Sequence, residues 1–427
     1  MMDWPYALAL LLGLIFFFLA LGVPVAFAFF AANLVGAYVF LGGTVGMMTM
    51  ARSTLTAIAL FALAPIPLFI LVGAILFHTG LASRAVEAID RLIAKVPGRL
   101  ALVAISGGTV FSALSGSTVA NTAILGSTLI PEMTKRGYHP TMSMGPILGT
   151  GAIAILIPPS AITVLLGSLA QISIADLLIG GILPGILIAV LFFGYVIVRC
   201  LLNPSLAPAY DVERLPFWER VLPFLLYVVP LLAIFVVIVG SILGGIATPT
   251  ESAALGSVAA FLAALAYGRL TWANLRAAIL ETAKVSTMVL FIIAGSITFS
   301  QILAFSGATS GILKLVTSWD LSALELIVVL LLVLLVLGCF VDQLSMIMIT
   351  LPFFMPLAKT MGIDLVWFGI LMLLMLEVSF TTPPFGMLLF VMKGVAPPGT
   401  TMREIYLAAA PFILLVILVV CLVVAIP

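Results

Sequence analysis

Charged side chains, histidine and cysteine are all scarce in this chain. Only 8% of its 427 residues are charged, whereas 64% are hydrophobic. A chain of this composition has too little polar surface to cover a water-soluble fold. Soluble enzymes are therefore excluded, nucleic acid is not an expected partner, and a lipid bilayer is expected around most of the chain.

The few cysteines and histidines show no pattern of reactive or metal-binding residues. Cys200, Cys339 and Cys421 lie far apart, each in or beside an apolar run, and His78 and His139 are isolated at the ends of apolar segments. Metal sites and disulfide frameworks need closely spaced or paired ligands. We interpret all five as packing or structural residues, so metal catalysis has no support and no cofactor is expected.

Long apolar runs, by contrast, are abundant. Most approach the roughly 20 residues that a membrane-spanning helix requires. The runs are 7–21, 23–41, 54–77, 177–198, 221–240, 252–266, 285–303 and 405–426. No basic segment precedes the first run, and no small-residue cleavage site follows it. This run is therefore expected to be a retained span and not a signal peptide. The sequence predicts an all-α polytopic membrane protein.

The proline and glycine pattern occurs twice, with a constant offset of 225 residues. Pro24, Pro131, Gly137, Pro158 and Pro159 recur as Pro249, Pro356, Gly362, Pro383 and Pro384. In a chain this apolar, duplicated halves with matching helix breaks are typical of secondary transporters built from an inverted repeat. The binding site is then expected where the two halves meet.

The basic residues predict an orientation in the membrane. With the N-terminus outside, fourteen Lys and Arg residues fall inside and only Arg52, Lys314 and Lys359 fall outside, which accounts for all 17. The inside set is Arg84, Arg91, Lys95, Arg99, Lys135, Arg136, Arg199, Arg214, Arg220, Arg269, Arg276, Lys284, Lys393 and Arg403. The positive-inside rule then places both termini on the outer side.

Two pairs of short helices are predicted to be re-entrant hairpins. Residues 100–114 and 118–134 flank Ser115-Gly116-Ser117 and would be roughly 22 and 25 Å long at 1.5 Å per residue, short for a ~30 Å hydrocarbon core. The second half repeats this around Val341-Asp342-Gln343. One hairpin is expected to open inward and the other outward.

The repeat also suggests a division of the chain into domains. A polar-faced arm helix is expected at 81–96, with a weaker counterpart at 311–316. The expected parts are scaffold spans and arm at 1–98, a first transport-domain half at 99–200, a linker at 201–220, second scaffold spans and arm at 221–321, and a second transport-domain half at 322–427.

Paired prolines interrupt one long helix in each half. Proline donates no backbone hydrogen bond, so Pro158 and Pro159 release the carbonyls of residues 154 and 155, and Pro383 and Pro384 those of 379 and 380. Such groups need partners at membrane depth. Freed carbonyls at half-helix C-termini suit Na⁺, and free N–H groups at half-helix N-termini suit an anion.

These breaks and hairpin tips define the candidate site. A first sodium site is predicted at Ser112, Ser115, Ala154, Ile157 and Pro159, and a second at Gly338, Val341, Ser379 and Thr382. Hard cations favour such oxygen ligands. The candidate substrate residues are Ser117, Thr118, Asn121, Ser160, Asp342 and Thr381. The alternative is that small residues only allow close helix packing and that the prolines are structural kinks.

The roles of the acidic residues and of the other prolines in the apolar regions have more than one interpretation. Asp342 could orient the hairpin tip or favour a cation, whereas Glu251 and Glu377 could pair with a basic residue or cap a half-helix. Pro65 and Pro67 break the third span, either to line the transport path or to form a hinge.

At these residues the chain resembles the large membrane subunit of tripartite ATP-independent periplasmic (TRAP) transporters. The matching segments are 65–69 (PIPLF), 115–121 (SGSTVAN), 130–138 (IPEMTKRGY), 157–160 (IPPS), 181–185 (GILPG) and 382–386 (TPPFG). Each is weak alone, but their order and spacing over nearly the whole chain are specific.

The resemblance implies an elevator-type, Na⁺-driven importer of organic acids in the bacterial inner membrane. It also implies a periplasmic substrate-binding protein and a small membrane subunit of about four helices, expected to be a separate polypeptide. A self-sufficient Na⁺/dicarboxylate carrier of the same broad fold is the alternative. A channel would need a continuous polar pore and an intramembrane protease a catalytic constellation, and neither pattern is evident.

Overall fold

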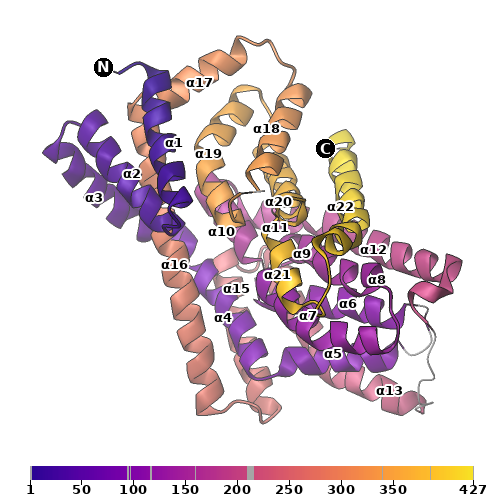
Figure 1. Ribbon diagram of the computed structural model, residues 1–427. Coiled ribbons are helices and arrows are strands. Elements are labelled where there is room, and N and C mark those ends of the chain that lie inside the picture. The colour runs from indigo at the N-terminus through magenta and orange to yellow at the C-terminus, as the bar shows by residue number, and fades with distance from the viewer. Residues whose placement is uncertain are drawn as a thin grey trace.

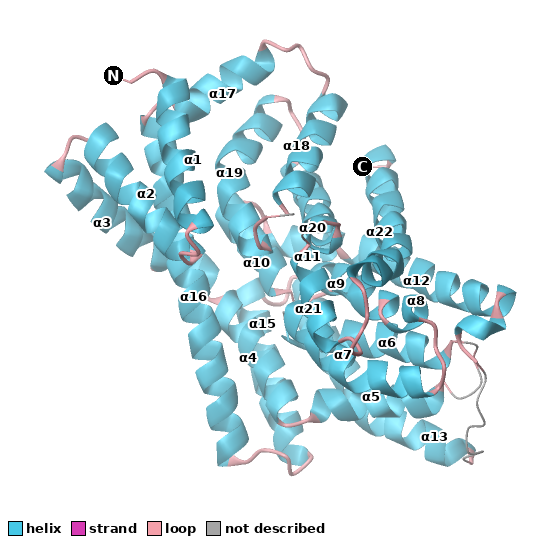
Figure 2. Ribbon diagram, viewed as in Figure 1, coloured by secondary structure: helices cyan, strands magenta, loops and turns pink. Residues whose placement is uncertain are grey.

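The structure is a computed structural model that describes residues 2–93, 96, 98–115, 118–158, 160–208, 216–338, 340–384 and 386–426, without the side chains of residues 62, 111–115 and 120. Over these residues the chain is helical and contains no strand (Figure 2). Five helices are long and apolar enough to cross a membrane, or seven when two bent pairs each count as one span. The predicted all-α polytopic fold is confirmed.

The first half runs from α1 to α12. Its elements are α1 (Trp4–Ala20), α2 (Val25–Phe40), α3 (Thr44–Ile58), the 3-10 turn η1 (Phe61–Leu63), α4 (Pro65–His78), α5 (Leu81–Leu92), α6 (Arg99–Ser115), α7 (Thr118–Lys135), α8 (Pro140–Ser143), α9 (Gly145–Leu156), α10 (Ala161–Ala170), α11 (Ile174–Gly180) and α12 (Ile182–Leu202).

The connection and the second half follow. They contain the 3-10 turn η2 (Pro204–Leu206), α13 (Phe217–Pro223), the π-helical segment η3 (Phe224–Val228), α14 (Val229–Leu243), α15 (Pro249–Ala266), α16 (Trp272–Phe305), α17 (Ala308–Thr317), α18 (Ala323–Leu337), α19 (Gln343–Thr360), α20 (Leu365–Thr381), α21 (Met387–Val395) and α22 (Met402–Ala425).

The 225-residue repeat extends to the helix boundaries. Shifted by this offset, Thr118–Lys135 becomes 343–360, which are the bounds of α19, and the α8–α9 segment 140–156 becomes 365–381, the bounds of α20. The two halves are inverted: α5 lies at the lower part of the molecule and α17 at the upper, and the helix pair α18–α19 lies above α6 and α7 (Figure 1). Both chain ends lie in the upper part (Figure 1).

The two broken helices form the centre of the molecule. Every residue of α9 is buried, and so is every residue of α20 from Phe368 to Thr381. A helix that is apolar on all sides must be enclosed by other helices. The chain bends by 45° between the α8–α9 segment and α10, and α20 ends before Pro383, so both predicted breaks are present.

The halves differ where the first half carries two extra prolines. The apolar run 54–77 is interrupted: α3 ends at Ile58, and α4 begins at Pro65. Its counterpart α16 continues unbroken for 34 residues because Leu290 and Ile292 occupy the positions equivalent to Pro65 and Pro67. The arm helix α5 bends by 65° from α4 and ends at Leu92, before the predicted Val96.

Candidate functional site

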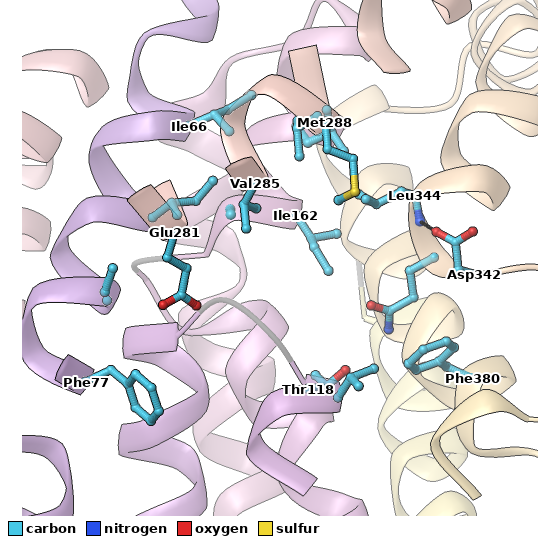
Figure 3. Close-up of a pocket in the computed structure, with 18 of the residues that line it drawn as sticks. Ile66, Phe77, Thr118, Ile162, Glu281, Val285, Met288, Asp342, Leu344 and Phe380 are labelled. Carbon is cyan, nitrogen blue, oxygen red and sulfur yellow. Dashed lines mark hydrogen bonds between the residues drawn. The ribbon is translucent and has the colours of Figure 1, made fainter. Parts of the chain in front are cut away.

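A cavity of about 340 Å³ lies where the two halves meet. One wall comes from α4 and the lower half of α16, and the other from the starts of α7, α10, α19 and α21 and the end of α20. Figure 3 shows Glu281 on one side, Asp342 on the other, and Thr118 and Phe380 near each other at the lower edge. We call this the inner cavity. It adjoins both predicted hairpin tips and both helix breaks.

Asp342 organises the second hairpin tip. Its side chain is the N-cap of α19 and accepts hydrogen bonds from the backbone N–H groups of Leu344 (3.1 Å) and Ser345 (3.3 Å), and from the Ser345 hydroxyl. A carboxylate at this position satisfies N–H groups that have no partner within the helix and faces the positive end of the helix dipole. Asp342 thus orients the tip while lining the inner cavity.

Behind the tip lies a buried carboxyl group. Glu377 in α20 is 2% exposed, and its Oε2 accepts a hydrogen bond of 2.6 Å from Nε2 of Gln343, whereas Oε1 has no partner among the described residues. The sequence allowed Glu377 a basic partner or a capping role; the structure gives it an amide partner. Glu251 does cap a helix, since it completes the capping box of α15 with Thr248.

The fit around Glu377 depends on a glycine of the other half. A Cβ atom at Gly151 in α9 would collide with Oε1 of Glu377 and would lie 2.9 Å from Cγ2 of Thr118. Only a residue without a side chain lets α9 and α20 approach this closely. Sequence reasoning missed Gln343 and Gly151 as neighbours of Glu377, because nothing in the offset of 225 residues pairs them.

The predicted substrate residues occupy different places. Thr118 and Asp342 line the inner cavity. Asn121 is fully buried and donates to the Thr150 hydroxyl over 2.7 Å. The hydroxyl of Thr381 donates to carbonyls of its own helix, at 3.0 Å from Glu377 O. Ser117 lies outside the described residues.

The first break uses a threonine that the sequence did not single out. The Thr163 hydroxyl lies 2.5 Å from the Ile155 carbonyl, which the prolines leave without a backbone donor, and 2.9 Å from Oγ of Ser160. Ser160 is the N-cap of α10 and accepts from the Thr163 N–H over 3.3 Å. The released carbonyl of Ile155 is therefore satisfied within the protein.

The other predicted residues of the first sodium site are placed in part. Ala154 is buried in α9 and Ile157 is the residue after that helix. Ser112 and Ser115 belong to α6, but their side chains lie outside the described residues, as does all of Pro159.

The second break brings several predicted residues together. Gly338, the residue after α18, lies directly against Ser379. The contact is so close that a Cβ atom at Gly338 would collide with the Ser379 side chain. The Thr382 hydroxyl donates to Val378 O over 2.6 Å, and Val341 follows α18 at the tip. The prediction that the prolines free the Ser379 carbonyl is wrong, because the N–H of Thr382 donates to it over 3.2 Å in a tightened last turn.

Within the described residues, no group of three or more His, Cys, Asp or Glu side chains could hold a metal ion. His78 instead lies 2.5 Å from Oε2 of Glu281 at the edge of the inner cavity. Carboxylate, hydroxyl and amide oxygens also lie near the cavity, and such groups can bind a hard cation or hydrogen-bond to an acid.

Comparison with known proteins decides the family. The sequence profile of the DctM component of tripartite ATP-independent periplasmic transporters matches residues 12–427. The chain belongs to this family. Large permease subunits of this kind are transport proteins.

Curated TRAP permeases resemble the chain over most of its length. It is 32% identical to the C4-dicarboxylate TRAP transporter large permease protein DctM of Pseudomonas aeruginosa, over 86% of this chain and 84% of that one. It is 31% identical to the isethionate TRAP transporter permease protein DctMQ of Oleidesulfovibrio alaskensis, over 92% of this chain and 61% of that one. It is 29% identical to the ectoine permease TeaC of Halomonas elongata, over 96% and 94%.

Solved structures show that the TRAP permease shares its fold with other transporters. The YdaH transporter of Alcanivorax borkumensis superposes with a TM-score of 0.64 at 16% identity, covering 90% of this chain and 89% of that one. MtrF of Neisseria gonorrhoeae superposes with a TM-score of 0.57 at 14% identity, covering 90% and 84%. At these identities the likeness concerns the fold alone.

Proposed function

We propose that this permease imports a small organic acid of the carboxylate or dicarboxylate class, driven by Na⁺. The observation that carries the proposal is the inner cavity, which lies between α4 and α16 on one side and both hairpin tips and both helix breaks on the other. Named relatives carry C4-dicarboxylates, isethionate or ectoine, all small polar solutes. Thr118 and the half-helix N-termini would face the acid, and oxygens near the breaks would hold the cations.

The arrangement supports an elevator mechanism. The hairpins and broken helices would form a transport domain from residues 99–200 and 322–427, which slides against a scaffold built by α1–α4 and α14–α16. The arms α5 and α17, one at each side of the molecule (Figure 1), would join the two parts. Each Na⁺ that crosses a potential of about 100 mV contributes ~2.3 kcal/mol, enough to concentrate a solute.

The sodium sites remain those assigned from the sequence. The contact of Gly338 with Ser379 supports the second site, because it brings the end of α18 against the break in α20. In the first site, the Ile155 carbonyl already has a hydroxyl partner, so the cation would be held by oxygens of Ala154, Ile157 and Pro159 together with Ser112 and Ser115.

The proposal includes the place and the partners of the chain. It would be a multi-pass protein of the bacterial inner membrane, with both termini on the periplasmic side. Many large apolar side chains are exposed on the scaffold helices, among them Phe17, Phe27 and Val236. These surfaces fit lipid and a small membrane subunit of about four helices. A periplasmic binding protein would deliver the substrate.

Uptake of labelled organic acids into proteoliposomes tests this function. The vesicles hold the permease with its small subunit, and uptake is measured with and without an inward Na⁺ gradient and the binding protein. Uptake only when both are present supports the tripartite importer. Uptake with Na⁺ alone supports the self-sufficient carrier, and flux that ignores the gradient refutes coupled transport.

A further inference from the structure

A second cavity, of about 660 Å³, lies between the scaffold and the transport helices. Its walls are α3 and the upper half of α16 on one side, and the end of α10 and the middle of α19 on the other. Helices α3 and α19 lie in the upper part of the molecule, as do both chain termini (Figure 1). We call this the outer cavity.

The internal repeat relates the two cavities. Thr56 and Leu60 line the outer cavity, and the residues 225 positions later, Glu281 and Val285, line the inner cavity. The same scaffold surface is thus used twice, once on each side of the molecule. Inverted-repeat transporters give access to one site alternately from two sides, and a pair of cavities related by the repeat fits such a path.

The two cavities differ in charge. Among the described residues, the lining of the outer cavity includes Arg52 of α3 and no acidic residue. The described lining of the inner cavity includes Asp342 and Glu281, of which Glu281 pairs with His78, and no Lys or Arg. Arg52 is exposed, and its guanidinium has no hydrogen bond or ion pair within the described part of the chain. Ser53, Ser300 and Gln301 supply further polar groups to the same lining.

Arg52 belongs to the basic residues assigned to the outer side, and its exposed guanidinium is available to an anion that enters the cavity. Guanidinium groups bind carboxylates with two parallel, charge-assisted hydrogen bonds. Among the three basic residues assigned to the outer side, Arg52 lines this cavity, while Lys314 and Lys359 are exposed at the ends of α17 and α19 and line neither cavity.

We propose that the outer cavity is a vestibule in which Arg52 receives the carboxylate of the incoming substrate before the transport domain takes it up. This inference rests on the proposed function, since it takes the substrate to be a carboxylate that enters from the side of the termini.

The transport test compares Arg52→Gln with Arg52→Lys in the complete complex, and uses Lys314→Gln as a matched removal of an outer charge away from the cavity. Arg52→Gln is expected to raise about tenfold the concentration of loaded binding protein that gives half-maximal uptake, with the maximal rate little changed. Arg52→Lys should restore most of the loss, and Lys314→Gln should behave as wild type.

Equal half-maximal concentrations in wild type and Arg52→Gln would overturn the vestibule. A lower maximal rate alone would overturn it too, since it would place Arg52 in the conformational cycle. If wild type itself shows no Na⁺-dependent uptake, the proposed function fails instead, and the following measurement decides about the vestibule.

Thiol labelling measures the electrostatic potential in the outer cavity and does not require transport. Ser53→Cys is introduced in full-length chain whose Cys200, Cys339 and Cys421 are replaced by alanine, and its reaction rates with an anionic and a cationic methanethiosulfonate are compared. Adding Arg52→Gln is expected to lower the anionic-to-cationic rate ratio about fivefold, because the local potential becomes less positive. An unchanged ratio would show that Arg52 does not attract anions into the cavity.

Discussion

The two halves of this permease share a backbone plan but differ in their polar groups. Helices α7 and α19 have equivalent bounds, yet the second half carries Asp342 and Glu377 where the first half has Ser117 and Ala152. A repeat needs matching prolines, glycines and apolar faces to fold twice in the same way, whereas the polar side chains near its tips and breaks can differ between the halves. The second half therefore supplies both acids, and Gly151 of the first half makes room for the buried Glu377.

The two helix breaks show the same difference. In the first half, the side chain of Thr163 satisfies the released carbonyl of Ile155 over 2.5 Å. In the second half, Phe380 is the equivalent of Ile155 and Leu388 the equivalent of Thr163, so this position carries no hydroxyl. The N–H of Thr382 donates to Ser379 O over 3.2 Å, whereas the N–H of Ile157, the residue equivalent to Thr382, donates to Ile153 O over 3.0 Å. Equivalent prolines thus lead to different solutions, which depend on the polar residues nearby.

The largest loss of stability is expected at Gly151, where α9 of the first half packs closely against Glu377 of the second. Gly151→Ala places a Cβ against Glu377 and Thr118 and should lower the free energy of unfolding by about 3 kcal/mol, at the upper end for overpacking. Steric trapping in bicelles measures this value. Gly194→Ala, at a helical glycine with nothing within 4 Å, is the control and should change little. Similar losses in both variants would contradict the close fit.

The next effect concerns the acid that distinguishes the second half. Glu377→Ala leaves the buried amide of Gln343 without its 2.6 Å partner and should cost about 2 kcal/mol in the same measurement. Glu377→Gln keeps an acceptor oxygen and should cost markedly less. Equal losses in the two variants would mean that the charge of Glu377, and not its hydrogen bond, stabilises the fold.

The helix breaks can be removed one at a time. Pro383→Ala allows a backbone donor within α20 and is expected to reduce Na⁺-driven uptake about tenfold, because the half-helix ends no longer point into the site. Pro158→Ala tests the equivalent break. Initial uptake rates in proteoliposomes, normalised to reconstituted protein, give the comparison. Wild-type rates in Pro383→Ala would reduce that break to a packing feature.

The smallest loss of stability is expected at the helix break of the first half, between α9 and α10. Thr163→Val keeps the shape of the side chain but removes the hydroxyl bound to Ile155 O, and should cost about 1 kcal/mol of unfolding free energy. Thr128→Val removes a hydroxyl that bonds the carbonyl of Ile124 on the exposed face of α7, so it should cost little. Thr163→Val without a loss would show that the Ile155 carbonyl finds another donor.

Much of the architecture could be predicted from the sequence because membrane helices are set by local composition. The offset of 225 residues predicted two halves, and paired prolines predicted breaks near residues 158 and 383. Pro65 and Pro67 likewise marked the interruption before α4, while α16 stays whole without them. Each of these signals acts through the backbone within a few residues.

The side-chain contacts could not be predicted in this way. Gln343 meets Glu377 because α19 packs against α20, and Gly151 meets the same acid from the other half of the chain. Thr118 faces the inner cavity, whereas Asn121, three residues later, is turned toward Thr150. Nothing local distinguishes these polar residues.

The sequence by itself determined the solvent, the number of halves and the positions of the helix breaks, because hydrophobicity and backbone hydrogen bonding are properties of short segments. Only the tertiary structure decided which polar groups share a cavity and that Arg52 lies on one side while Glu281 lies on the other. Those relations join residues more than 200 positions apart, and they exist only once the two inverted halves pack against each other.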